Sequence, residues 1–181
     1  LATLPALKSM CLRQTTPDDE PALAHHESLT ELLRVPSLRS VCFNHFNFTP
    51  ALCQATANGL MEGTAITKLE FAYCSFSALE CAVVMANGLR RNTSVSHIKV
   101  ETPLDQALLN ALTAALLSNS TLRHLDLSWY YDVFSDDSDV VRDLAPLLLA
   151  LGDNTGLTIL NVDMHGSIDD SMDESLCPAM K

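Results

Sequence analysis

One short apolar pattern recurs along this chain and constrains its fold more than any other feature. The pattern reads apolar-x-x-apolar-x-apolar, and the similar segments Pro5–Leu12 and Pro36–Phe43 define its register. Its copies are Leu7/Met10/Leu12, Leu38/Val41/Phe43, Ile66/Leu69/Phe71, Val95/Ile98/Val100, Leu122/Leu125/Leu127 and Leu157/Leu160/Val162. They start 27 to 35 residues apart, and a leucine stands six residues before each start. This spacing predicts about six repeats, each long enough to hold a helix.

The apolar spacing changes within each repeat, from a period of two to the spacing of a helix. This change predicts a strand, a loop and then a helix in each repeat, with strands near residues 8–12, 39–43, 67–71, 96–100, 123–127 and 158–162. Ser77 and Glu80 form a capping-box pattern at the start of one predicted helix. Asn92, Asn119 and Asn154 each lie three residues before a strand pattern, where a short amide can hold the backbone of the turn.

The repeats resemble a known family. The segments TSVSHIKV, STLRHLDLS and TGLTILNVD, with helices such as ECAVVMANGLRRN, are similar to ribonuclease-inhibitor-type leucine-rich repeats over essentially the whole chain. Cys74 stands at the Asn/Cys position that follows the strand in this family, whereas Thr15, Phe46 and His165 occupy the matching sites of other repeats. The resemblance implies an α/β leucine-rich repeat solenoid, which is a right-handed βα superhelix or horseshoe. Its parallel β-sheet would line the concave face and its helices the convex face.

We expect residues 1–181 to form a single fragment of such an array. In a parallel stack, the side chains between the apolar strand positions point to the concave face and form columns about 4.8 Å apart. The candidate protein-binding residues on this face and its rim are Lys68, Glu70, His97, Lys99, Glu101, His124, Asp126, Ser128, Trp129, Tyr130, Asn161 and Asp163. Glu70, Lys99 and Asp126 alternate in charge along one column. They could form a specificity patch for a charged partner or a self-neutralising ladder.

Two groups of residues in these columns are of types that can bind a metal or take part in catalysis. His97 and His124 stand side by side near Asp126, which suggests a metal or acid–base site, but no fourth ligand or enclosing pocket is evident. Cys11 and Cys42 share a column, yet parallel neighbours rarely suit disulfide geometry and no basic residue is placed to lower a thiol pKa. Exposed strand histidines and reduced structural thiols are the simpler interpretation. We therefore expect no catalytic residue, no cofactor and no metal.

The rim offers a second kind of binding feature. Trp129 and Tyr130 follow a strand pattern and precede a long loop, so they form a candidate hot spot, although either ring could instead cover the next repeat. Acidic clusters fall in the predicted strand-to-helix loops at Asp18–Glu20, Asp136–Asp139 and Asp169–Glu174. They would make one edge negative. That edge could steer a basic partner or complement the helix dipoles.

The composition of the chain limits the classes of partner that it is expected to bind. The net charge of -11 opposes binding to nucleic acid and to anionic membranes. No apolar run approaches the ~20 residues of a membrane span. The first residues lack the charged segment followed by an apolar segment that is typical of a secretory signal. The six cysteines show neither a CxxC pair nor a zinc spacing and fit reduced thiols in a cytoplasmic or nuclear protein, although sequons at Asn47, Asn92 and Asn119 argue against an intracellular location. We expect a protein partner, with a basic one as an option, and no small-molecule ligand.

These observations favour a noncatalytic protein–protein interaction scaffold. A Gly-rich phosphate loop, a GxSxG elbow and an HExxH pair are all absent from the sequence, so an enzyme would have to rely on scattered residues such as His97 and His124. Two alternatives come from the family resemblance. One is a GTPase-activating regulator like the Ran GTPase-activating protein, and the other is the sensing region of a nucleotide-binding immune-type receptor.

Overall fold

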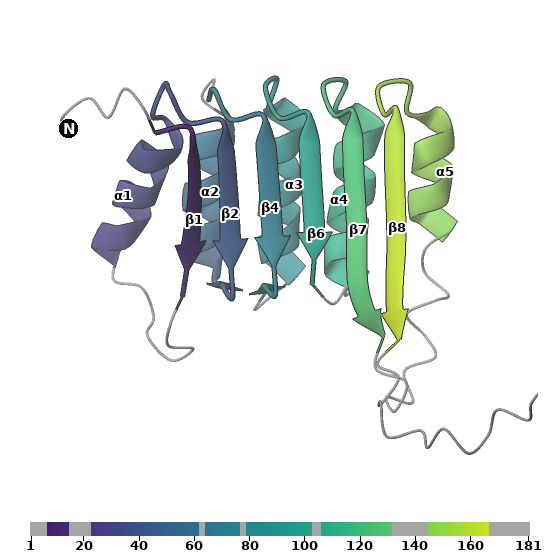
Figure 1. The fold of residues 1–181 in the computed structure, drawn as a ribbon, viewed down its shortest axis with the longest axis horizontal. Helices are drawn as coiled ribbons and strands as arrows, with labels where there is room; N and C mark the ends of the chain where they lie inside the picture. The colour runs from purple at the N-terminus through teal and green to yellow at the C-terminus, as the bar shows by residue number, and fades with distance from the viewer. Residues whose placement is uncertain are drawn as a thin grey trace, which may run out of the picture.

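The computed structural model describes residues 7–14, 23–61, 64–76, 79–102, 106–131 and 145–166. Within these ranges the protein is α/β, with a six-stranded sheet and five helices that pack against one face of it (Figure 1). The sheet strands are β1 (Ser9–Arg13), β2 (Ser40–Asn44), β4 (Lys68–Ala72), β6 (His97–Glu101), β7 (His124–Tyr131) and β8 (Ile159–Gly166). The helices are α1 (Leu23–Leu33), α2 (Pro50–Met61), α3 (Leu79–Arg91), α4 (Gln106–Ser118) and α5 (Ala145–Asp153).

The six strands lie parallel and in chain order, β1-β2-β4-β6-β7-β8. Each begins one residue later than the sequence pattern predicts, and β7 and β8 continue past their predicted ends because Trp129–Tyr131 pair with Met164–Gly166. Two short strands that the pattern does not predict, β3 (Asn47–Phe48) and β5 (Ser75–Phe76), pair with each other. The predicted sequence of strand and helix, and the parallel pairing of the strands, are confirmed.

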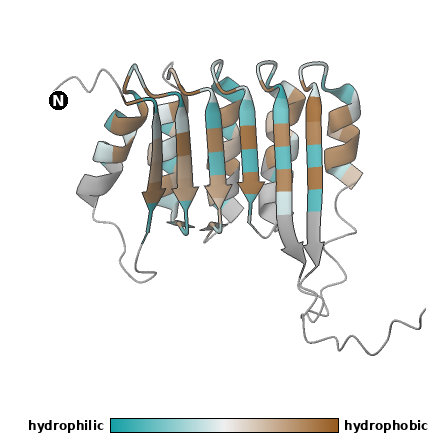
Figure 2. Cartoon of the chain, in the orientation of Figure 1, coloured by the Kyte–Doolittle hydropathy of each residue, from teal (hydrophilic) through white to brown (hydrophobic). Residues whose placement is uncertain are grey.

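The apolar pattern forms the core between the two layers. Figure 2 shows hydrophobic and hydrophilic bands alternating along β7 and β8. Leu38, Leu69 and Leu125, from three different repeats, are all 0% exposed and belong to one continuous cluster with the buried helix residues. The same positions are exposed on β8, the last strand of the sheet, where Leu160 is 38% and Val162 is 48% exposed. Burial therefore depends on having a neighbouring repeat on both sides.

The three asparagines before the strands hold the turns as predicted. Asn92 donates from Nδ2 to the carbonyl of Leu60 at 2.7 Å, and its Oδ1 accepts from the backbone N–H of Val95 at 2.6 Å. Asn119 and Asn154 repeat this arrangement one and two repeats later. Each asparagine therefore ties its own turn to the helix of the preceding repeat, which is α2 for Asn92, α3 for Asn119 and α4 for Asn154.

Several predicted features can be placed and others cannot. Cys74 is buried with its thiol 3.4 Å from the Phe43 carbonyl. In addition, Thr49 precedes α2 and accepts a hydrogen bond from the Leu52 N–H at 3.4 Å. The Ser77 cap, Thr15 and the three acidic clusters lie outside the described residues. In the part of the chain that the structure describes, no helix combines the length and the apolar character needed to cross a bilayer.

Candidate functional site

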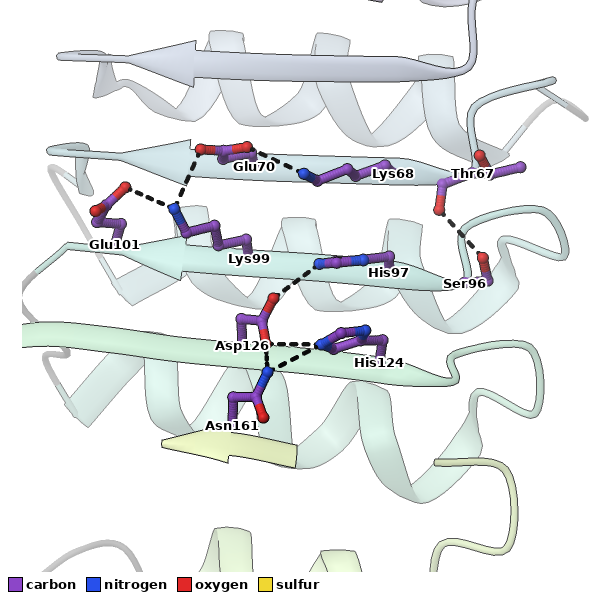
Figure 3. Close-up of polar contacts among 10 residues, drawn as sticks. All are labelled: Thr67, Lys68, Glu70, Ser96, His97, Lys99, Glu101, His124, Asp126 and Asn161. Carbon is purple, nitrogen blue, oxygen red and sulfur yellow. Dashed lines mark hydrogen bonds and ion pairs between the residues drawn. The ribbon is translucent and has the colours of Figure 1, made fainter. Parts of the chain in front are cut away.

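The helices cover one face of the sheet (Figure 1). Polar side chains of β4, β6, β7 and β8 gather on the opposite face (Figure 3). Strand register brings equivalent residues of adjacent repeats side by side, so His97 pairs with His124 and Lys99 lies between Glu70 and Asp126. On β6 the side chains alternate between half-buried and buried, because one side of the strand meets the helices and the other does not. We call this surface the polar face, defined by Lys68, Glu70, His97, Lys99, Glu101, His124, Asp126, Ser128, Asn161 and Asp163.

One half of the polar face is an ion-pair ladder. Glu70 lies 3.6 Å from the ammonium of Lys68 and 3.6 Å from that of Lys99, and Lys99 also donates to Glu101 at 3.1 Å. Burial acts to lower the pKa of Lys99, but the hydrogen bond to Glu101 and the charge of Glu70 outweigh it and raise the pKa above its usual value. Lys99 therefore stays charged at neutral pH and is held by two acids.

The other half is a cluster of two histidines, one carboxylate and one amide (Figure 3). Asp126 lies with one oxygen 2.9 Å from His97 Nε2 and with the other 2.8 Å from His124 Nε2. The two imidazole rings stack with centroids 4.1 Å apart and planes 22° apart. Asn161 Nδ2 reaches the same carboxylate at 2.5 Å. Asp126 therefore turns toward the histidines, and the alternating column of charges divides into two separate groups.

This arrangement shifts the pKa values of His97 and Asp126. Burial is the main cause that lowers the pKa of His97 below its ordinary value, against the opposing hydrogen bond with Asp126. Burial alone would raise the pKa of Asp126, but the hydrogen bonds from Asn161, His124 and His97 together bring it below its usual range. At neutral pH the cluster thus holds an ionised carboxylate beside a largely neutral His97.

The cluster is also a donor set for a cation. One ligand atom from each of His97, His124 and Asp126 lies within 4.8 Å of the others, and all three residues are half-buried. The sequence pattern places His97 beside His124 in one column and Asn161 beside Asp126 in the next. It does not predict that the amide of Asn161 turns toward the cluster, because an amide on the outer side of Asp126 can adopt more than one orientation.

The remaining predicted residues lie around this cluster. Ser128 pairs in register with Glu101 and Asp163, and Asp163 is exposed. The backbones of Trp129 and Tyr130 belong to β7, but their side chains lie outside the described residues, so their role as a hot spot stays a prediction.

Cys11 and Cys42 are register neighbours on β1 and β2, and both are free thiols. Burial, followed by the hydrogen bond and the charge from Cys11, raises the pKa of Cys42 to about 12. A thiol with so high a pKa remains protonated at neutral pH and is a poor nucleophile. Cys42 therefore fits the structural interpretation.

A hollow of about 400 Å³ at the carboxyl ends of β1, β2 and β4 was not predicted from the sequence. It is lined in part by Arg13, His45, Asn47, Tyr73 and Ser75. His45 and Tyr73 both have positive φ, at 56° and 53°, and their rings stack 5.0 Å apart. Non-glycine residues seldom adopt this conformation, so the sequence carries no signal for it.

No protein-family model matches this chain, and no curated protein matches it either.

Proposed function

We propose that this chain is a leucine-rich repeat module of the ribonuclease-inhibitor type, a right-handed horseshoe-shaped solenoid that binds a protein partner and catalyses no reaction. One observation carries the proposal. Equivalent residues of six consecutive repeats stand in register on a sheet whose helices cover only the other face. Stacked repeats of this kind offer a long surface suited to another protein.

The polar face suits recognition because its groups can exchange partners. The ion pairs of Glu70 with Lys68 and Lys99 are half-exposed and long, at 3.6 Å each. Pairs of this kind contribute only about 0–1 kcal/mol, so replacing them with contacts to a partner costs little. Lysines and acids alternate here, which favours a partner surface carrying both signs of charge. The net charge of -11 adds a general attraction for a basic partner.

An intracellular location, cytoplasmic or nuclear, belongs to the same proposal. The cysteine pattern supports it, because the six cysteines include no CxxC pair and no zinc spacing, as expected for thiols that are kept reduced.

Affinity capture with matched variants tests the proposal. Lys68→Ala/Glu70→Ala removes an ion pair from the polar face. Glu31→Ala/Arg34→Ala removes a 2.7 Å ion pair between α1 and the residue that follows it, in the helix layer. Both variants are neutral in net charge, and both remove exposed or half-exposed groups. We expect quantitative mass spectrometry to show that partners captured by the unaltered chain fall by about tenfold with the polar-face variant, the loss associated with one hot-spot contact.

The helix-layer variant should capture the same partners at unchanged levels. Equal losses in both variants would point to reduced folding or to binding elsewhere, and unchanged recovery with the polar-face variant would contradict the proposal. Thermal unfolding of each variant establishes that both remain folded during capture.

A further inference from the structure

We propose that His97, His124 and Asp126, completed by Asn161, form a binding site for one divalent transition-metal ion such as Zn²⁺ on the polar face. This inference goes beyond protein recognition, because it concerns an ion that the chain binds by itself. It rests on the distances within the cluster, on the hydrogen-bond conflict at His124, and on the charges around it.

The donor atoms already lie almost at the spacing that an ion requires. Zinc bonds nitrogen and oxygen at about 2.0–2.1 Å, so neighbouring donors of a tetrahedral site lie roughly 3.3 Å apart. The two nitrogen–oxygen contacts of Asp126 measure 2.9 and 2.8 Å, and all three donor atoms fall within 4.8 Å. An ion placed among them would need the two contacts to Asp126 to lengthen by about 0.5 Å.

The donor types suit the same class of ion. Neutral imidazole nitrogen and carboxylate oxygen are ligands that zinc and its neighbours in the first transition series prefer. Both histidines direct Nε2 toward the oxygens of one carboxylate, so two ring nitrogens and a negative charge face the same small region. On binding, each imidazole carries its proton on Nδ1 and gives the Nε2 lone pair to the ion. No redox change is involved.

The hydrogen bonds around His124 conflict without an ion. His124 Nε2 lies 2.8 Å from Asp126 Oδ1 and 3.2 Å from Asn161 Nδ2, while Asn161 Nδ2 lies 2.5 Å from that same oxygen. A ring nitrogen either donates a proton or accepts one, so Nε2 cannot satisfy both neighbours. An ion resolves the conflict, because it takes the lone pair of His124 and the charge of Asp126. Turning the amide then offers Asn161 Oδ1 as a fourth ligand.

The surrounding charges favour a cation at this point. The nearest lysines, Lys68 and Lys99, are drawn toward Glu70 and Glu101 at 3.1 to 3.6 Å, which reduces their repulsion of an ion. The chain as a whole carries a net charge of -11. The histidine side chains are each 26% exposed and that of Asp126 is 19% exposed, so an ion can enter from solvent. The same opening leaves room for a water ligand.

Calorimetric titration of Zn²⁺ into the chelator-treated 181-residue chain tests the site. Thiols also bind zinc, so the titration uses a Cys11→Ser/Cys42→Ser/Cys177→Ser background under reducing conditions. We expect one ion per chain, and affinities at least about 100-fold weaker in His124→Asn and in Asp126→Asn. Asn161→Ala should bind about tenfold more weakly, as expected for a weaker ligand.

His45→Asn is the matched control, because it removes a histidine that follows β2, two strands away from β6, and asparagine tolerates the φ of 56° found there. Its zinc affinity should equal that of the background chain. The visible absorption of bound Co²⁺ gives a second readout, which should be present in the control and absent in His124→Asn. Far-UV circular dichroism without metal verifies that every variant is folded.

Two results would overturn the site: no saturable binding of Zn²⁺ to the background chain, or unchanged affinity in both His124→Asn and Asp126→Asn. Because the titration contains only the metal and this chain, such a result would leave the protein-binding proposal standing. A chain that binds zinc but captures no partner would contradict the protein-binding proposal and leave the metal site standing.

Discussion

At the scale of single residues, the buried asparagines carry more of the stability than their small size suggests. Asn92 is 3% exposed and links three backbone groups, the Leu60 carbonyl and the N–H groups of Ser94 and Val95. A buried backbone group that loses its partner costs about 1–3 kcal/mol. One side chain thus satisfies groups from two different repeats.

Replacing Asn92 with alanine should therefore lower the free energy of unfolding by about 3 kcal/mol, since the turn loses its bonds and no water reaches them readily. Urea denaturation followed by circular dichroism measures the change. Asn87→Ala, at an exposed position of α3, is the control and should alter stability by less than about 0.5 kcal/mol. A loss below about 1 kcal/mol for Asn92→Ala would mean that the turn is held by other contacts.

At the scale of elements, glycines set the distance between neighbouring helices. A Cβ added to Gly88 of α3 would lie 2.9 Å from the Cα and the Cβ of Ala57 in α2. Gly59 of α2 has the same relation to Leu33 of α1, with a built Cβ 2.8 Å from its Cδ1. Gly59 and Gly88 stand at corresponding positions of two repeats, so the close approach recurs. The helices touch there because a side chain is lacking.

Gly88→Ala should therefore destabilise the protein by about 1–2 kcal/mol, although alanine by itself favours a helix by about 1 kcal/mol. The clash is with backbone atoms, so α3 must move away from α2. Thermal and urea unfolding measure the effect. Gly152→Ala in α5 is the control, because nothing lies within 4 Å of its added Cβ, and it should stabilise by up to about 1 kcal/mol. Equal effects of the two substitutions would show that helix spacing does not depend on Gly88.

At the scale of the whole molecule, the core is continuous but not uniform. Buried residues run as one cluster from Leu29 in α1 to Ala150 in α5. Leu160 and Val162 on β8 are 38% and 48% exposed. The matching residues of β4 and β6 are between 0% and 5% exposed, namely Leu69, Phe71, Ile98 and Val100. Repeats that contact neighbours on both sides lose more apolar surface to water than those at an edge.

Hydrogen exchange should follow this gradient. We expect the amides of β4 and β6 to exchange only with global unfolding, and those of β8 to exchange at least about tenfold faster through local opening. Mass spectrometry of peptides from the exchanged chain separates these strands. Equal protection of β8 and β4 in the native chain would contradict the gradient and indicate a single all-or-none unit.

Much of this fold could be predicted from the amino-acid sequence because the same apolar pattern recurs in six repeats. Alternation at Leu69 and Phe71, followed by helical spacing, indicates which side of each element is buried, and six copies in one register imply the columns of the sheet. Asn92 and its equivalents could be read in the same way, since their position relative to each strand is constant. Their hydrogen bonds follow from local geometry.

The contacts within the candidate site could not be predicted in this way. A side chain on a strand has neighbours on both adjacent strands, and it can form a hydrogen bond or an ion pair with either of them. Asp126 could have joined Lys99 in a ladder, but in the folded protein it bonds to His97 and His124, and Asn161 turns toward them as well. Column membership is a property of the pattern and so was determined by the sequence alone. The choice of partner was decided only by the tertiary structure, since rotamers, burial and competing charges act together there across β4, β6, β7 and β8.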